Sequence, residues 1–415
     1  MKKTLLTICL VWMCFSLSAQ KIIDLSGKWS FSIDRQDNGE KEKWFSHTLN
    51  DFINLPGSMP EKQKGDEVTA KTQWTGSLYD SSYYYNPYME KYRKEGNIKF
   101  PFFLTPDKHY VGAAWYQKEV NIPADWKGER ILLFLERPHI ETTVWVNGQK
   151  TGMQNSLCVP HQYDITHYVR PGKCTITIRV DNRIKEINVG PDSHSITDQT
   201  QGNWNGIVGR ICLQTTPKTY FDDIQIYPEP EQKLARVKVV IKGTGTAKVK
   251  LSAESFNTDK KHIVPAIQQE IKLNKGVTET EMVLPMGNDM LLWDEFHPAL
   301  YKLKAEVTNG KKTEIKEIQF GMRRFEIKGK WFYVNGRKTQ LRGTVENCDF
   351  PLTGYAPMDV ESWERVFRIC RSYGLNHMRF HSFCPPEAAF MAADRVGFYL
   401  QPEGPSWPNH GPKLG

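Results

Sequence analysis

Seven residues near the end of the sequence have side chains that could act on a hydroxyl-rich molecule. They follow three short apolar segments and are Glu346, Asn347, Asp349, His381, Ser382, Glu403 and Trp407. Carboxylate, amide and imidazole groups exchange hydrogen bonds with hydroxyl groups, and an indole ring can stack on a sugar ring. Any one of them could instead provide loop polarity or helix capping. Together they favour a binding pocket for a polyhydroxylated ligand.

Other chemistries fit these residues less well. His381 and Ser382 are adjacent, and neighbouring residues of a strand point to opposite faces, so they do not form a nucleophile and base pair. No HExxH sequence or comparable ligand spacing is present. We therefore expect no metal site and no cofactor.

Alternating strands and helices must position these residues. Apolar residues recur at spacings of three and four from Val360 to Cys370, with Asp359 as a possible N-cap and Gly374 as a stop, which predicts a helix. A second helix begins at two prolines, where the missing N–H costs little. The predicted order is strand 340–345, helix 359–373, strand 375–380, helix 385–396 and strand 398–401.

This order favours parallel strands with right-handed crossovers, as in a (β/α)8 barrel. In such a barrel, active-site groups follow the carboxyl ends of the strands, where the seven residues lie. Three parallel strands alone leave a sheet edge and much apolar surface uncovered. We therefore expect residues 326–415 to be the first three βα units of a truncated TIM barrel, and the chain to be the front part of a longer protein.

The preceding sequence is mainly β. Residues 20–219 alternate apolar and polar residues in short runs, and Asn147-Gly148 favours a tight hairpin turn. Ile176, Ile178 and Val180 share one face of a strand predicted to be half-buried. Residues 57–111 form a long excursion from this sandwich, rich in tyrosines that either pack the loop down or stack on sugars.

A second β domain is predicted over residues 220–325. Its expected strands are 236–242, 247–252, 269–273, 281–284, 301–308 and 313–320. About seven short strands in roughly 100 residues suit an immunoglobulin-like β-sandwich. The Cys and Trp hallmarks of antibody domains are absent, so only the architecture is predicted.

Composition narrows the function classes. The 415 residues have 25% charged residues and a formal net charge of +8 without long basic runs, so no nucleic-acid binding is expected. Residues 1–19 have the layout of a signal peptide, which predicts a secreted or periplasmic protein with no membrane span. Six further cysteines are scattered without a CxxC pair, which argues against a zinc site or dense disulfide scaffold.

Seven short motifs, in order and spacing, give the sequence its resemblance to a known family. They are residues 111–116 (VGAAWY), 144–149 (VWVNGQ), 163–166 (YDIT), 204–207 (WNGI), 320–323 (FGMR), 334–337 (VNGR) and 341–343 (LRG). In these motifs the chain resembles glycoside hydrolase family 2, which contains β-galactosidases, β-glucuronidases and β-mannosidases. The resemblance implies a jelly-roll sugar-binding-like domain, an immunoglobulin-like domain and a catalytic (β/α)8 barrel.

The resemblance also implies hydrolysis of β-glycosides with retention, by one glutamate as acid/base and another as nucleophile, about 5–5.5 Å apart. In the family these follow the fourth and seventh barrel strands. We therefore expect both beyond Gly415, and the chain as given to be inactive. Glu403 matches an acidic residue at the end of the third strand and is not expected to replace either one.

The resemblance implies that some residues of this chain help to form the substrate pocket. Arg342, Gly343 and Arg379 match family positions in the first two barrel strands. Asn347 stands where galactosidase-like members have histidine, and residues 381–384 (HSFC) replace a Ser-His-Tyr-Pro segment. Residues 404–407 (GPSW) replace a run that includes a magnesium site. Neither galactose specificity nor that metal is therefore expected.

We expect the intact protein to be a secreted retaining exo-β-glycosidase of carbohydrate metabolism, acting on a β-linked oligosaccharide or glycoside. The expected substrate-binding residues are Asn347, Asp349, Arg379, His381, Ser382, Glu403 and Trp407. The alternative is a non-catalytic secreted carbohydrate-binding protein on the same sandwich, and a third hypothesis is a structural cell-surface protein. The sequence leaves oligomer formation open.

Overall fold

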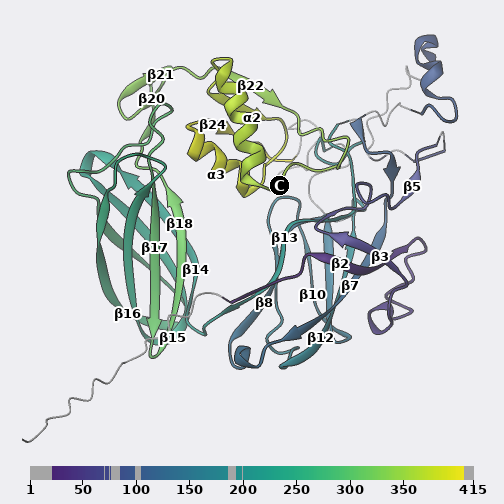
Figure 1. The fold of residues 1–415 in the computed structure, drawn as a ribbon, viewed down its shortest axis with the longest axis horizontal. Helices are drawn as coiled ribbons and strands as arrows, with labels where there is room; N and C mark the ends of the chain where they lie inside the picture. The colour runs from purple at the N-terminus through teal and green to yellow at the C-terminus, as the bar shows by residue number, and fades with distance from the viewer. Residues whose placement is uncertain are drawn as a thin grey trace, which may run out of the picture.

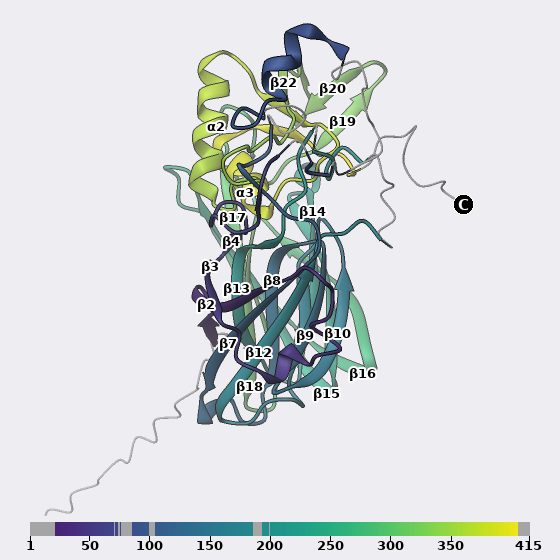
Figure 2. The same ribbon diagram turned by 90° about the vertical axis from the view of Figure 1, so that its right-hand side faces the viewer.

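The computed structural model describes residues 21–69, 71–73, 75, 85–98, 104–185, 193–198 and 200–405. Figure 1 shows two β units side by side, with a segment of alternating strands and helices across one end of both. Figure 2, turned by 90°, shows helices α2 and α3 of that segment above the strands of the β units. The predicted signal peptide and Trp407 lie outside the described residues. None of the described helices is long and apolar enough to cross a membrane.

The first β unit consists of two packed sheets. One has the order β1-β13-β8-β11 with β4 beside β13, and the other has the order β10-β9-β12-β7-β2-β3. The strands are β1 (Ile22–Asp24), β2 (Gly27–Asp34), β3 (Asp51–Leu55), β4 (Gly57–Ser58), β7 (Ala113–Ile122), β8 (Arg130–His139), β9 (Glu141–Val146), β10 (Gln149–Asn155), β11 (His161–Asp164), β12 (Gly172–Asp181) and β13 (Gly206–Thr216). Buried side chains of both sheets form one core, which includes Trp29, Leu133 and Ile178.

The turn between β9 and β10 was predicted correctly. Asn147 and Gly148 have φ values of 50° and 78°, which suit asparagine and glycine. The half-buried prediction for β12 was wrong, because Thr177 and Arg179 on its outer face are 1% and 7% exposed. The connection between β2 and β3 covers this face, and its Asp37 binds Arg179.

The predicted excursion contains short pieces of structure among the described residues. These are β5 (Asp66–Glu67), which pairs with β6 (Lys108–His109), and the 3-10 helix η2 (Pro87–Tyr92). Tyr85 and Tyr88 are both 83% exposed, so neither packs the loop down. Tyr79, Tyr83 and Tyr84 lie outside the described residues.

The second β unit has fewer, longer strands than predicted. They are β14 (Tyr220–Glu229), β15 (Leu234–Phe256), β16 (Ile263–Pro285), β17 (Leu300–Asn309) and β18 (Lys312–Phe320). The expected strands 236–242 and 247–252 are one strand, as are 269–273 and 281–284. Pairing of β15 with β16 continues through a register shift at Gly243/Gly245, where the φ of Gly245 is 85°. A bulge bends a strand without ending it, so a glycine here was mistaken for a turn.

The third segment begins with a hairpin sheet and continues as a parallel sheet. Its elements are β19 (Phe325–Lys328), β20 (Trp331–Val334), β21 (Arg337–Thr339), β22 (Gly343–Glu346), α2 (Val360–Ser372), β23 (His377–Phe380), α3 (Glu387–Val396) and β24 (Tyr399–Gln401). Strands β22, β23 and β24 are parallel neighbours in that order, as predicted. Strand β22 starts three residues later than the expected strand 340–345, and residues 337–339 form the separate strand β21, which pairs with β20.

Both helices lie within the predicted ranges 359–373 and 385–396, and α3 begins two residues later than predicted. The Asp359 side chain accepts a hydrogen bond from the Ser362 N–H at 2.8 Å and caps α2. Pro386 precedes α3, and Gly397 ends it with a φ of 76°. Trp363 and Phe367 of α2 pack with Met378 and Phe380 of β23 in one buried core. The helices therefore cover one face of the parallel sheet and leave the other face free for a site.

Candidate functional site

Strand register places Arg379 on the free face of the parallel sheet. Its neighbours in β23, Met378 and Phe380, are 2% and 0% exposed and lie in the core beneath the helices. Successive side chains of a strand alternate between faces, so Arg379 points the other way. Val345 of β22 and Gln401 of β24 lie beside it in register.

Arg379 and Glu403 form the centre of the candidate site. Arg379 Nε donates to Glu403 Oε1 at 2.5 Å, and the Ser382 N–H donates to Glu403 Oε2 at 2.9 Å. Partial burial would raise the pKa of Glu403, but the two donors outweigh it and hold that pKa below its ordinary value. Glu403 is therefore a fixed, ionised acceptor at the carboxyl end of β24.

His381 and Asn347 extend the cluster to the end of β22. His381 Nδ1 lies 3.2 Å from Asn347 Oδ1. The rings of His381 and His194 are 4.4 Å apart between centroids and inclined at 45°. Burial, followed by the nearby His381, lowers the pKa of His194 to about 4, so this imidazole is neutral at neutral pH.

Residues 193–198, 200 and 201 of the first β unit wall one side of the cluster. Gln201 Nε2 donates to the carbonyls of Asn347 and His381 at 2.7 and 2.9 Å. Ser195 Oγ donates to the carbonyls of Ser382 and Pro405 at 2.9 and 2.8 Å. The loops after β22 and β23 and the segment after β24 are thus fixed by side chains from a different part of the chain.

Arg137 of β8 fixes the second βα loop from another direction. Its guanidinium donates to the carbonyl of Cys384 at 3.0 Å and lies over the ring of Phe383 at 5.6 Å. At 9% exposure it is buried between the first β unit and the loop. This contact, with those of Gln201 and Ser195, makes the first β unit part of the site's architecture.

The structure brings together five of the seven predicted site residues. They are Asn347, Arg379, His381, Ser382 and Glu403. Ser382 contributes its backbone, because the residue is 3% exposed and a φ of 51° turns its N–H toward Glu403. Asp349 lies apart from this hydrogen-bonded cluster and lines a neighbouring cavity. Trp407 lies outside the described residues.

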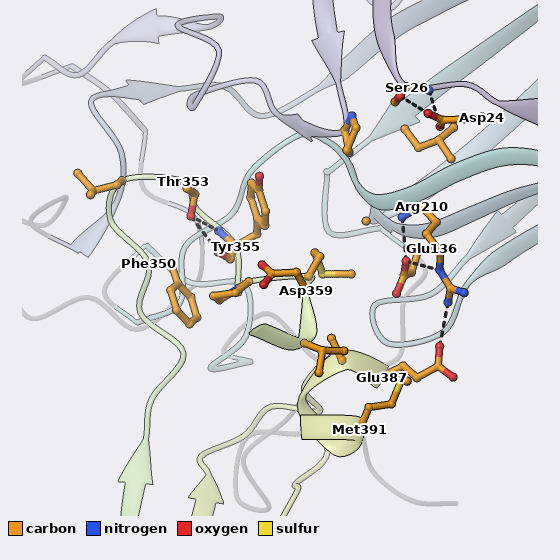
Figure 3. A pocket seen from close by; sticks show the side chains of 18 of the residues that line it. Asp24, Ser26, Glu136, Arg210, Phe350, Thr353, Tyr355, Asp359, Glu387 and Met391 are labelled. Atoms are coloured by element: carbon orange, nitrogen blue, oxygen red, sulfur yellow. Dashed lines mark hydrogen bonds and ion pairs between the residues drawn. The ribbon is translucent and has the colours of Figure 1, made fainter. Parts of the chain in front are cut away.

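That cavity, shown in Figure 3, has a volume of about 880 Å³ and lies between the first β unit and the loop that follows β22. Its wall includes Phe350, Thr353, Tyr355 and Met391. Arg210 crosses from β13 to α3, where its guanidinium binds Glu387 at 2.8 Å. The cavity therefore lies at the N-terminal ends of α2 and α3, next to the cluster.

Two carboxyl groups near the end of β22 have raised pKa values. Burial, followed by the neighbouring Glu346, raises the pKa of Asp349 to about 6. Burial also raises the pKa of Glu346, whose Oε1 accepts the Cys348 N–H at 2.8 Å. Glu346 is in register with Phe380 and points toward the helix layer. Its role is to hold the loop that carries Asn347.

The sequence interpretation missed His194, Ser195, Gln201 and Arg137. These residues lie in β8 and in a segment before β13, far from the strand ends in sequence. The available signal was the motif at residues 204–207, which directly follows the walling segment. Nothing in local patterning tells which loop of a sandwich contacts another domain.

The cluster can bind hydroxyl groups at fixed positions. Glu403 supplies an acceptor, Arg379 a planar donor, and His381 and Asn347 supply both kinds of group. Within residues 200–405, the hydrogen-bonded cluster holds one carboxylate, Glu403. Hydrolysis by a carboxylate pair needs a second one nearby, so this cluster alone fits binding and orientation.

Comparisons with known proteins identify relatives of both β units. A family model described as "Glycosyl hydrolases family 2, sugar binding domain" matches residues 22–217. A second model, "Glycosyl hydrolases family 2", matches residues 219–323. Together they cover both β units.

Among curated relatives, human β-glucuronidase is 24% identical over 92% of this chain and 57% of its own length. A β-galactosidase of Thermoanaerobacter pseudethanolicus is 24% identical over 76% of this chain and 42% of its own length. Among solved structures, a Ruminococcus gnavus β-glucuronidase has a TM-score of 0.68 at 20% identity, over 93% of this chain and 59% of its own. The chain thus spans about half the length of the relatives it matches.

Proposed function

The chain belongs to glycoside hydrolase family 2, and we propose that it is part of an exported, retaining exo-β-glycosidase whose substrate pocket includes the cluster around Arg379 and Glu403. The observation that carries this proposal is the set of hydrogen bonds at the carboxyl ends of three parallel strands. Active sites of (β/α)8 barrels lie at these strand ends.

The architecture of the proposed enzyme follows from the three segments. Residues 20–219 are a jelly-roll domain, residues 220–325 an immunoglobulin-like domain and residues 326–415 the opening of the catalytic barrel. Supporting the last of these, both helices lie on one face of a parallel sheet, and β22 and β24 each pair on one side only among the residues that the structure describes. Free edges of parallel strands are normally paired or covered.

In this proposal the described residues bind and orient the substrate. Glu403 accepts a hydrogen bond from a sugar hydroxyl, and Arg379 keeps that carboxylate ionised and in place. His381 and Asn347 form the neighbouring wall, with the neutral His194 ring behind it. Acid/base and nucleophile glutamates from later barrel strands supply the reaction itself, about 5–5.5 Å apart across the glycosidic bond.

The substrate class follows from the relatives and the cluster together. Relatives named as β-glucuronidases and β-galactosidases cleave β-glycosides, and we propose a β-linked glycoside or oligosaccharide as the substrate here. The single fixed carboxylate with its arginine suits hydroxyl recognition. Export is proposed on the layout of residues 1–19, with a secreted or periplasmic location.

The test uses the complete product of the gene and a panel of aryl β-glycosides. Arg379→Ala should lower kcat/KM at least about tenfold, because a hydrogen bond to a charged group is worth about 1.5–3 kcal/mol. The matched control is Arg368→Ala, which removes an arginine that binds Glu364 on the outer side of α2. Equal kcat/KM values for the two variants would show that the cluster is not part of the substrate pocket.

A second candidate function is carbohydrate binding without catalysis. It is supported by the family model for a sugar binding domain, which covers residues 22–217. A glycan array probed with the full 415-residue chain tests it. Binding that survives Arg379→Ala would favour a site on the first β unit, whereas loss of binding would favour the cluster.

A further inference from the structure

Cys158 and Cys384 meet across the contact between the first β unit and the parallel sheet. Cys158 lies between β10 and β11, and Cys384 lies between β23 and α3. Both are half-buried free thiols. Cys384 is among the groups that shift the pKa of the Cys158 thiol. The Cys158 thiol therefore lies near the residue that carries the other thiol.

Arg137 holds the two cysteine backbones on one guanidinium group. Its Nη1 donates to the Cys384 carbonyl at 3.0 Å, and its Nη2 donates to the Cys158 carbonyl at 3.3 Å. A guanidinium is planar and presents its donors in a fixed fork. The two chain segments are thus fixed relative to each other by a buried residue, and the approach of the thiols does not depend on side-chain rotamers alone.

Burial and charge act in opposite directions on the Cys158 thiol. Burial raises its pKa, while the positive charge of Arg137 counteracts part of that rise. Cys348 lies under the same arginine, but burial raises its pKa well above the ordinary value and it is 3% exposed. A reagent therefore has better access to the half-buried pair than to Cys348.

We propose that Cys158 and Cys384 form a disulfide that joins the first β unit to the parallel sheet when the protein meets a disulfide oxidant. One cysteine loses its proton and attacks a small-molecule disulfide, which releases one thiol and leaves a mixed disulfide. The second thiolate attacks that mixed disulfide and releases a second thiol. One S–S bond forms in the protein as one is reduced in the oxidant.

The bond would fix the wall of the candidate site. Cys384 directly follows residues 381–383, and the loop is already attached to the first β unit through Arg137 and Ser195. A covalent link between distant points of a chain mainly restricts the unfolded state, and more so when the enclosed loop is long. The oxidised chain should therefore unfold at a higher temperature than the reduced chain.

The test measures thiols in the full chain at several ratios of reduced to oxidised glutathione. Free thiols are alkylated and the digest is mapped by mass spectrometry, with circular dichroism to verify folding. We expect a peptide linked through Cys158 and Cys384 in oxidising buffer, lost on reduction. Cys158→Ser and Cys384→Ser should each abolish it and leave the other cysteine as a free thiol or as a mixed disulfide with glutathione. Cys370→Ser, the control on α2, should keep it.

Thermal unfolding gives an independent readout. A reductant should lower the Tm of the wild-type chain and of Cys370→Ser by several degrees, and leave that of Cys158→Ser unchanged. The proposal is overturned if both thiols of the folded chain are alkylated at every ratio. It is equally overturned if glutathione stays attached to one of them, or if Cys384 links to Cys348. The outcome does not depend on glycosidase activity.

Discussion

Arg379 and Glu403 are joined by a hydrogen bond of 2.5 Å from Nε to Oε1, which connects the end of β23 to the chain just past β24. The other carboxylate oxygen accepts the Ser382 N–H. Both oxygens of Glu403 are therefore fixed before any ligand arrives. A site with such fixed groups loses less entropy when it binds a substrate.

The pH dependence of stability should report this carboxylate. The pKa of Glu403 is lowered in the folded chain. The contribution of this carboxylate to the free energy of unfolding is therefore fully present above the ordinary pKa of 4.5, and it is lost as the pH falls through the pKa of the folded chain. Glu403→Gln should therefore lower Tm at pH 7, and the difference from wild type should shrink toward pH 3. A difference that stays constant over this range would contradict the ionised pair.

Asp349 should show the opposite dependence. Its folded pKa of about 6 lies above the ordinary value of 3.8, so the folded state binds more protons between these values and stability falls as the pH rises through them. Asp349→Asn should be more stable than wild type at pH 7, by up to about 1 kcal/mol after allowance for solvent screening. In urea unfolding experiments this gain in stability should disappear near pH 4. An equal gain at pH 7 and pH 4 would contradict the raised pKa of Asp349.

Trp363 should be the main support of α2. The residue is 1% exposed, its Nε1 donates to the Pro357 carbonyl at 2.8 Å, and its ring lies 5.6 Å from that of Phe380. Trp363→Ala should cost about 3–5 kcal/mol in urea unfolding, because it leaves a cavity and an unpaired carbonyl. Tyr373→Ala, at an 81% exposed position just past the C-terminal end of the same helix, should cost less than about 0.5 kcal/mol. Similar losses of unfolding free energy in the two variants would contradict the role of Trp363 in the packing of α2.

His194 should affect substrate binding more than the chemical step. Its ring faces His381 from the first β unit, and burial keeps it neutral by lowering its pKa to about 4. In the complete gene product, His194→Ala should raise KM several-fold and leave kcat nearly unchanged, because it removes the support behind His381, whose wall contacts substrate equally before and during reaction. His167→Ala, at an exposed position of the same β unit, is the control. Unchanged KM in both would exclude His194 from the wall.

The sequence predicted features that depend on neighbours in the chain. The Asp359 cap, the Asn147-Gly148 turn and the parallel order of the last three strands are local patterns with specific physical causes. Polar residues at strand ends pointed to Asn347, His381 and Glu403 because parallel strands bring their carboxyl ends together. Strand β15 was split in two because the bulge at Gly243/Gly245 has the composition of a turn.

Features that depend on contacts between domains could not be predicted in this way. His194, Gln201 and Arg137 reach the site because the first β unit packs against the βα loops, and no periodicity records that contact. The outer face of β12 is buried within the first β unit itself, where the connection between β2 and β3, distant in sequence, covers it. A side chain that forms hydrogen bonds with the backbone of another domain can be recognised only when the positions of both domains are known.

The central claim is that this chain supplies the walls and part of the pocket of a family 2 glycosidase, with the reacting glutamates outside it. The most direct measurement is hydrolysis of a panel of aryl β-glycosides by the purified 415-residue chain, alongside the gene product extended to its next stop codon. The account predicts activity in the longer product, with one sugar preferred, and none in the 415-residue chain. Activity in the 415-residue chain would contradict it, because the catalytic carboxylates would then lie among the residues described above.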